Sequence, residues 1–335
     1  MAHHNVGVRL VVTGVLAGLA MGYALQRTKL ALHGSFVGWP DHVPRVFRTW
    51  ILAVAIGAVG LTVIYAGDWW PELNEGLAFR PVANTIGGIV LGFGMVLAVT
   101  SASGLFYNLG AGTVTCLTGL IGFVVGDAVG GWIDLPGAGV IAAGEGATLP
   151  GVLDVPRWTV AVPFAAVTVV VLARVPVREE STRVRDQLGW VVGGVVLGVA
   201  LVGSWVLAGL GGHDFGPNTE GAVSSLLRGR PDRWEGAFVL ALIPGAAVAA
   251  LTTSVWALTR VHAGRLARLV VGGFLLGLGG QIAGGCNLGH GLSGVAQLGL
   301  SSWLVVGAIV VGIVLGRRLL AVTEEELHEL GDRLG

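Results

Sequence analysis

The sequence predicts an all-α polytopic membrane protein with about nine transmembrane helices, interrupted by broken or re-entrant loops. Of its 335 residues, 53% are hydrophobic and only 12% are charged, whereas roughly a quarter of the residues in a soluble protein are charged. The 57 glycines lie inside apolar runs without a three-residue period, as in closely packed membrane helices. The lipid bilayer is therefore the expected environment.

Apolar runs of membrane-spanning length follow one another along the chain. A helix needs about 20 mostly apolar residues to cross the hydrocarbon core. The first run contains Arg9 and lacks a small-residue cleavage site, so we expect a helix of the mature protein rather than a signal peptide. The predicted spans are 7–26, 49–66, 85–107, 112–131, 158–174, 188–210, 236–258, 268–288 and 299–316.

Lysine and arginine gather in alternate loops, as cytoplasmic loops do. The loops 67–84 and 132–157 are mainly acidic, and 211–235 is the exception, an outer loop by parity that holds three arginines. We expect a multi-pass protein of the cell inner (plasma) membrane, with its N-terminus outside and its C-terminus cytoplasmic. The residues that set this orientation are Arg27, Lys29, Arg45, Arg48, Arg174, Arg178, Arg183, Arg185, Arg260, Arg265, Arg268, Arg317 and Arg318.

The chain contains an internal repeat. A shift of 185 positions aligns residues 87–104 with 272–289, and seven of the 18 positions are identical. A weaker match pairs Gly18 and Gly22 with Gly194 and Gly198. The identical pairs in the first alignment are Gly87/Gly272, Gly88/Gly273, Leu91/Leu276, Gly92/Gly277, Gly94/Gly279, Ala98/Ala283 and Gly104/Gly289.

The paired segments lie in spans three and eight and in spans one and six. In each pair the two segments are five spans apart. Because five is odd, they cross the membrane in opposite directions, which predicts an inverted repeat with a pseudo-two-fold axis in the membrane plane. Solute carriers use this plan and place the solute path at the repeat interface. The expected organisation is a single transmembrane domain over 1–335, with a first repeat in 1–131, a linker with span five in 132–187, a second repeat in 188–318 and a cytoplasmic tail in 319–335.

Two glycine-rich polar segments, 100–112 and 283–294, interrupt the apolar pattern at corresponding places in the two halves. Irregular backbone at membrane depth must be buried in protein or line a wet cavity. Both segments are therefore predicted to be broken or re-entrant loops that face each other along a substrate path.

The second polar segment offers the side chains best suited to bind an anion. Cys286 provides a soft thiol, and Asn287, His290 and Ser293 can hydrogen-bond an anion or cap a short helix. For His290, proton relay and a bond to a neighbouring carbonyl both stay open. For Gln281, interhelical bonding and substrate contact both stay open.

The first polar segment supplies a matching set: Ser101, Ser103, Tyr107 and Asn108. Arg27 and Lys29 follow the first span and are interpreted as a cytoplasmic anchor or as an attraction for anions at the cytoplasmic mouth of the path.

Several function classes are disfavoured. A formal net charge of zero without a basic stripe argues against nucleic-acid binding. Cys116 and Cys286 lack the spacing of a disulfide framework or zinc site, so no metal or cofactor is predicted, and Cys116 is interpreted as core packing. Among acidic residues only Asp127 lies squarely within a span, which gives little support to a carboxylate proton relay.

Three motifs resemble the YeeE/YedE family of sulfur (thiosulfate) transport membrane proteins: GYALQRTK in 22–29, GFGMVLA in 92–98 and GGCNLGHGLSG in 284–294. The resemblance spans nearly the whole chain. It implies a permease that takes up a small inorganic sulfur anion, with a soluble sulfur-carrier or sulfurtransferase protein as a candidate partner.

In that family three cysteines line the path. Cys286 matches the third, whereas Ser101 stands where the second is expected and Ala31 where the first is expected. The resemblance therefore implies either a divergent member that moves thiosulfate or a related oxyanion, or a scaffold whose substrate has changed.

Transport rather than catalysis is the expected function, and the alternatives are two. A membrane-embedded sulfurtransferase would use Cys286 as nucleophile with His290 as base, but no third orienting group is evident. A transport-inactive accessory membrane subunit would explain the missing cysteines, although the polar residues around Cys286 argue against a decayed path.

Overall fold

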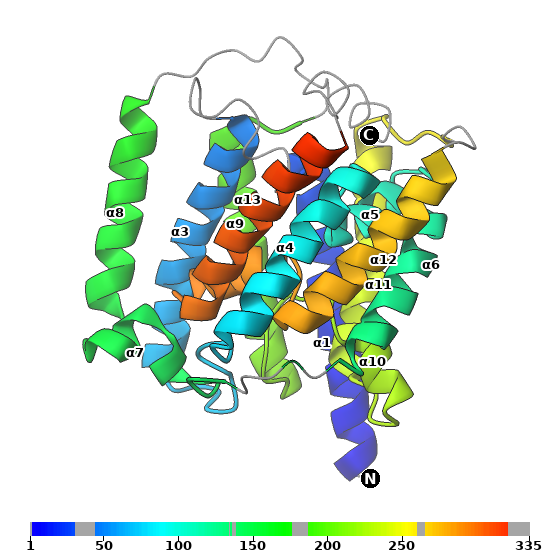
Figure 1. The fold of residues 1–335 in the computed structure, drawn as a ribbon. Helices are drawn as coiled ribbons and strands as arrows, with labels where there is room; N and C mark the ends of the chain where they lie inside the picture. The colour runs from blue at the N-terminus through cyan, green and yellow to red at the C-terminus, as the bar shows by residue number, and fades with distance from the viewer. Residues whose placement is uncertain are drawn as a thin grey trace.

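The computed structural model describes residues 2–30, 44–133, 135, 139–175, 187–259 and 265–320, and side chains from residue 7 onward. Within these ranges the chain is helical, with isolated β-bridges but no strand (Figure 1). The helices are α1 (Ala2–Thr28), α3 (Arg45–Ala66), α4 (Pro81–Ala98), α5 (Ala102–Gly110), α6 (Cys116–Gly130), η1 (Glu145–Ala147), α7 (Leu149–Leu153), α8 (Trp158–Arg174), α9 (Trp190–Gly211), α10 (Ala222–Leu227), α11 (Arg233–Thr252), α12 (Leu266–Ala283), the π-helix η3 (Gly289–Gly294) and α13 (Leu300–Leu319).

The helices confirm a polytopic membrane protein. In the described ranges, seven helical stretches are long and apolar enough to cross a membrane, counting α4 and α5 together, and α6 and α8 are shorter apolar helices. Each of the nine predicted spans therefore coincides with an apolar helical stretch.

Three predicted spans run past the end of a continuous helix. The span 236–258 overshoots α11, which ends at Thr252. The span 85–107 divides at 99–101, where Val99 adopts φ 55°. The span 268–288 ends at Ala283, because Gly284 takes up a left-handed φ of 86°. The amides of Gly284 and Gly285 then both bond the carbonyl of Gly280 at 2.9 Å, which satisfies the end of α12 as in a Schellman-type cap.

The contacts between helices follow a two-fold symmetric pattern. When the halves are matched as α1 with α9, α3 with α11, α4 with α12 and α6 with α13, the main contacts among these eight helices have counterparts. The pair α1–α11 corresponds to α9–α3, and α6–α12 corresponds to α13–α4, while α1–α9 and α4–α12 are contacts between equivalent helices. Equivalent helices also run in opposite directions, as α4 and α12 do in Figure 1, so the two halves are inverted relative to each other. The exact domain boundaries stay a prediction.

Contacts of the repeat glycines are reciprocal. Gly87 lies against the backbone of Ala283, and its repeat partner Gly272 lies against the backbone of Ala98, the repeat partner of Ala283. A Cβ atom on either glycine would clash with that backbone. The same relation holds for α1 and α9, where Gly18 and Gly22 contact α11 and Gly194 and Gly198 contact α3. Small residues thus set the closest helix contacts.

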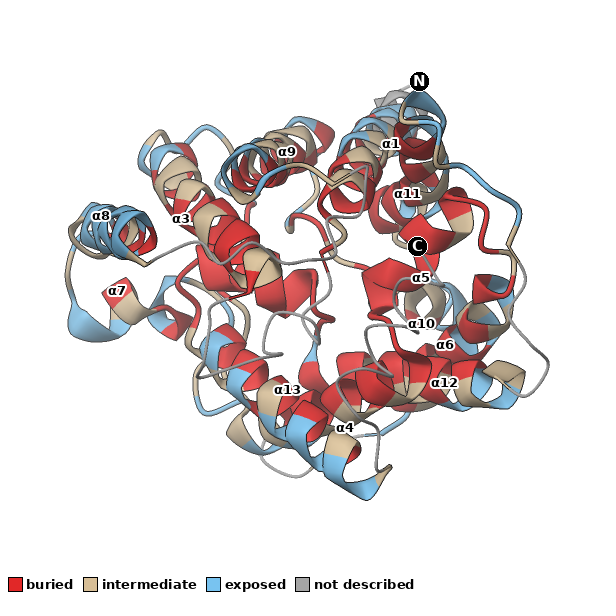
Figure 2. Ribbon diagram, turned by 90° about the horizontal axis from the view of Figure 1, so that it is seen from above, coloured by how far each residue is buried: buried red, intermediate tan, exposed pale blue. Residues whose placement is uncertain are grey.

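Viewed from above, buried residues line the sides of the helices that face the middle of the molecule (Figure 2). Helix α8 lies at the periphery, where it contacts α3 and leaves most of its valines exposed. In a chain that crosses a bilayer, such a face is suited to lipid contact.

The ends of the basic helices lie on one face of the molecule. Figure 1 shows the end of α1 and the starts of α3 and α12 on the same side as the ends of α8 and α13, and the start of α1 on the opposite side. The described chain thus begins and ends on opposite faces, as nine crossings require. The predicted tail beyond Leu320 lies outside the described residues.

Candidate functional site

The first broken segment turns the chain from α4 into α5. Val99 has φ 55°, a costly conformation for a β-branched residue. Ser101 then caps α5, and its Oγ accepts a hydrogen bond from the amide of Gly104 at 3.2 Å. Ser101 and Ser103 are both fully buried, so two hydroxyl groups face the protein interior at the start of a helix.

The second broken segment contains Cys286 and the π-helix. The Cys286 Sγ accepts hydrogen bonds from Thr219 Oγ1 at 2.9 Å and from the amide of Leu288 at 3.2 Å. It faces Asn218 Oδ1 at 3.7 Å. By the repeat relation Cys286 is the counterpart of Ser101, and each side chain accepts a bond from an amide of the turn that follows it.

The two segments meet directly. The side-chain Nδ2 of Asn287 donates to Ser103 Oγ at 3.1 Å, and Ser103 Oγ lies 3.4 Å from Ser101 Oγ. Polar groups from both halves are therefore in contact, as the repeat predicted. The Oδ1 of Asn287 is buried without a hydrogen-bond partner among the described residues.

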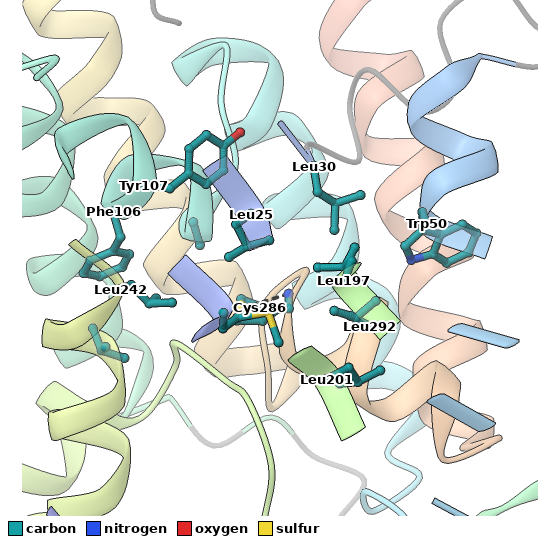
Figure 3. Packing of buried hydrophobic residues seen from close by; sticks show 14 of the residues in the cluster. Leu25, Leu30, Trp50, Phe106, Tyr107, Leu197, Leu201, Leu242, Cys286 and Leu292 are labelled. Carbon is teal, nitrogen blue, oxygen red and sulfur yellow. Dashed lines mark hydrogen bonds between the residues drawn. The ribbon is translucent and has the colours of Figure 1, made fainter. Parts of the chain in front are cut away.

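Apolar side chains enclose Cys286. Figure 3 shows the thiol among Leu25 of α1, Leu197 and Leu201 of α9, and Leu292 of the π-helix. All belong to one buried cluster. The site thus combines an apolar wall with a few polar groups, as small-molecule sites usually do.

Two other predicted residues, His290 and Ser293, connect the second broken segment to its neighbours through hydrogen bonds. The Nδ1 of His290 lies 2.9 Å from Ser302 Oγ, and its Nε2 lies 3.0 Å from the carbonyl oxygen of Ala283, both within hydrogen-bond distance. Of the two roles left open for this histidine, the carbonyl contact is the one observed. Ser293 donates to the carbonyl of Pro217 at 2.8 Å.

Gln281 lies beside the site rather than in it. With its amide oriented to satisfy both partners, it donates to Asp127 Oδ1 at 2.9 Å and accepts from Arg228 at 3.1 Å. The contact with Asp127 joins α12 to α6, which is the interhelical role considered for this residue.

The first half brings cationic groups near its own broken segment. Lys29 Nζ lies 5.8 Å from the ring centre of Tyr107 and donates to Gln26 Oε1 at 3.3 Å. Arg27 donates to Tyr23. Two buried donors, Gln26 Nε2 and Arg27 Nε, have no partner among the described residues. Such donors suit an oxyanion.

The remaining predicted residue of the first segment, Asn108, is buried in α5, and its carbonyl accepts from the amide of Thr113. Ala31, in the place of the family's first cysteine, lies outside the described residues. Cys116 is fully buried at the start of α6.

Sequence reasoning missed residues 217–220. They lie in the loop 211–235, which was predicted to connect two spans outside the membrane. Pro217, Asn218 and Thr219 all contact the second broken segment. A signal was available, because this loop follows span six as residues 30–44 follow span one. Applying the repeat to loops as well as helices would have placed it near the path.

An ion pair fixes this loop to α11. His213 Nε2 lies 2.8 Å from Asp232 Oδ2, and the His213 ring stacks on Trp234. Burial lowers the pKa of His213, but the hydrogen bond and charge of Asp232 outweigh it, so the pKa is raised from its usual value. Burial acts to raise the pKa of Asp232, yet its bond to His213 leaves that pKa lowered. Both shifts stabilise the charged pair.

The sequence model of the sulphur transport family matches residues 40–315, most of the chain. The chain belongs to this family. Thiosulfate transporter TsuA of Spirochaeta thermophila is 29% identical over 320 residues, covering 88% of this chain and 94% of that protein. Thiosulfate transporter TsuA of Escherichia coli is 24% identical over 332 residues, covering 91% of this chain and 93% of that protein. The predicted resemblance is confirmed.

Proposed function

We propose that this protein takes up thiosulfate, or a closely related sulfur oxyanion, along a path between the two broken segments. The observation that carries the proposal is the contact of these segments at Asn287 and Ser103, beside the buried thiol of Cys286, in a member of the sulphur transport family.

The polar groups here match the needs of a sulfur oxyanion. An anion that leaves water must exchange its hydration for protein donors. Hydroxyl groups of Ser101, Ser103 and Thr219 and the amide of Asn287 can bond its oxygens, while Cys286 offers a polarisable contact for a terminal sulfur. The apolar wall excludes bulk water, so each hydrogen bond there is electrostatically stronger.

The distribution of charge favours uptake toward the basic face. Arg27 and Lys29 lie at the end of α1, and we assign that face to the cytoplasm by the positive-inside rule. An anion passing Cys286 would then meet Lys29 beside Tyr107. The last turn of α1 adds two buried donors, Gln26 Nε2 and Arg27 Nε, that have no partner among the described residues. A soluble sulfur-carrier or sulfurtransferase protein that consumes the anion on this side is a candidate partner.

The enzyme alternative has no supporting contact in the part of the chain that the structure describes. Both ring nitrogens of His290 bond other groups, and Cys286 is bonded by Thr219 and Leu288 rather than by a base. The relatives are named transporters, and the transport proposal accounts for the buried polar contacts without a catalytic step.

Replacing the thiol tests this function. In proteoliposomes we expect uptake of labelled thiosulfate, and Cys286→Ala should lower its initial rate about five- to tenfold, the equivalent of one lost buried hydrogen bond. Cys116→Ala is the matched control, since it removes a buried thiol from core packing, and it should keep the wild-type rate. Wild-type uptake equal to that of empty liposomes for thiosulfate, sulfite and sulfate would refute the function.

A further inference from the structure

Glu220 is a buried acid that the path described above does not use. Its side chain is only 3% exposed, and neither carboxyl oxygen has a hydrogen-bond partner among the described residues. The carboxyl group lies against Gly280 of α12. The preceding residue, Thr219, donates to Cys286 Sγ, so this acid is adjacent in sequence to a direct contact of the central thiol.

Titratable groups from three other parts of the chain interact with Glu220. Asp127 of α6, Glu235 of α11 and Cys286 of the broken segment all interact with it electrostatically. Arg228, which follows α10, is directed to Gln281. The salt bridges found among the described residues do not include Glu220.

Its acidic neighbours are better satisfied than Glu220. Asp127 accepts hydrogen bonds from the amides of Gly221, Val223 and Ser224, which stabilise a negative charge. Glu235 has the side-chain amide of Asn218 as a hydrogen-bond partner. Among the described residues, Glu220 is thus the member of this acidic group whose carboxyl group has no hydrogen-bond donor.

Burial decides which form Glu220 adopts. An ionised carboxylate taken out of water costs several kcal/mol unless a cation or donors compensate it, and otherwise the group binds a proton. Two nearby carboxyl groups, those of Asp127 and Glu235, add repulsion and further disfavour a negative charge on Glu220. The neutral acid is the form that fits the observed surroundings.

We propose that Glu220 is the proton-binding residue of the transport path and that its proton crosses the membrane together with the anion. The inference rests on the proposed function. A neutral carboxylic acid can donate to an oxyanion near Cys286, whereas a carboxylate would repel it. Only the O–H bond breaks: the proton leaves on the side where the anion leaves, and a new proton binds from the side of entry. One unit less of negative charge then crosses per cycle.

Proton movement and anion movement can be measured together. Proteoliposomes holding a pH-sensitive dye are given labelled thiosulfate. In the wild type, uptake should acidify the interior, and an inward proton gradient should raise the initial rate. Glu220→Gln should lose both effects yet keep exchange of labelled for unlabelled thiosulfate, because the amide resembles the neutral acid. Glu145→Gln, at an exposed position, is the control and should behave as wild type.

Each other outcome overturns the inference. A Glu220→Gln protein that still couples protons to uptake shows that another group carries them, and one that loses exchange as well shows a role other than proton binding. Wild-type uptake without proton movement refutes the inference but leaves the proposed function intact. If the wild type takes up no thiosulfate, the function itself fails. Infrared spectra then decide whether Glu220 binds a proton. The wild type should show a protonated-carboxyl band that Glu220→Gln lacks, and identical spectra would refute the inference.

Discussion

Ser101 has both a structural and a substrate role in this interpretation. Its hydroxyl caps α5 through the amide of Gly104 and lies beside Ser103 and Asn287, where the two halves meet. A hydroxyl can bond the oxygens of an oxyanion but makes no soft contact with a terminal sulfur. This difference can be tested at the residue itself.

Restoring a thiol at this position should sharpen selectivity. Ser101→Cys is expected to raise the ratio of thiosulfate to sulfate uptake about two- to fivefold, the equivalent of a weak S–H contact of roughly 0.5–1 kcal/mol. Competition between labelled thiosulfate and unlabelled sulfate in proteoliposomes measures the ratio. The same change should weaken the α5 cap, with an upper bound of about 2 kcal/mol set by full loss of a cap.

Ser101→Thr provides the comparison, because it keeps the hydroxyl and the capping function. It should leave the uptake ratio unchanged. If the cysteine and threonine variants gave the same ratio, position 101 would not contact the sulfur end of the substrate.

Sequence reasoning located part of this site for a definite physical reason. Ser101 and Cys286 occupy equivalent repeat positions, so their segments had to face each other if the halves pack around an axis. Asn218, Thr219 and Glu220 escaped detection because they reach the site through the course of a loop, which hydropathy does not encode. The small support for a carboxylate relay had the same cause, since Glu220 lies outside every predicted span.

At the scale of elements, the contact between α4 and α12 is the one that leads directly into the two broken segments. Gly87 and Gly272 each meet the backbone of the opposite helix, at Ala283 and Ala98 respectively. Both alanines end their helices just before the broken segments. The glycine contacts therefore fix where the two polar segments begin relative to each other.

Adding one methyl group at this contact should loosen it. Gly87→Ala is expected to destabilise the protein by about 1–3 kcal/mol, the usual cost of overpacking, and to lower thiosulfate uptake by displacing the broken segments. Thermal unfolding in detergent, followed by circular dichroism, measures the first effect.

Gly203 of α9 provides the control. A Cβ there meets no atom within 4 Å, so Gly203→Ala should be neutral or stabilise its helix by roughly 0.5–1 kcal/mol. Equal destabilisation by the two substitutions would show that the close backbone contact at Gly87 is not the cause.

Helix ends were the least predictable feature of the elements. The span 85–107 reads as one apolar run because Val99, where the backbone turns, is itself apolar. Its φ of 55° is imposed by tertiary packing and not by local preference. The end of α12 was more readable, since Gly284 and Gly285 are residues that adopt positive φ readily.

At the scale of the whole molecule, the two faces differ in charge. The ends of α1, α8 and α13 that carry arginine lie on one face, together with the starts of α3 and α12. By the positive-inside rule we expect that face in the cytoplasm, although Arg228, Arg230 and Arg233 lie toward the opposite side. Orientation matters here because it sets the direction in which an anion and its proton move.

Cysteine labelling can determine this orientation. Both native cysteines are fully buried, so an impermeant maleimide added to intact cells should react little with the wild type. Glu145 and Arg174 are exposed near opposite ends of α8. Glu145→Cys should be labelled in intact cells, and Arg174→Cys only after the membrane is permeabilised. The reverse pattern would place the basic face outside, and labelling of both positions in intact cells would contradict a membrane crossing by α8.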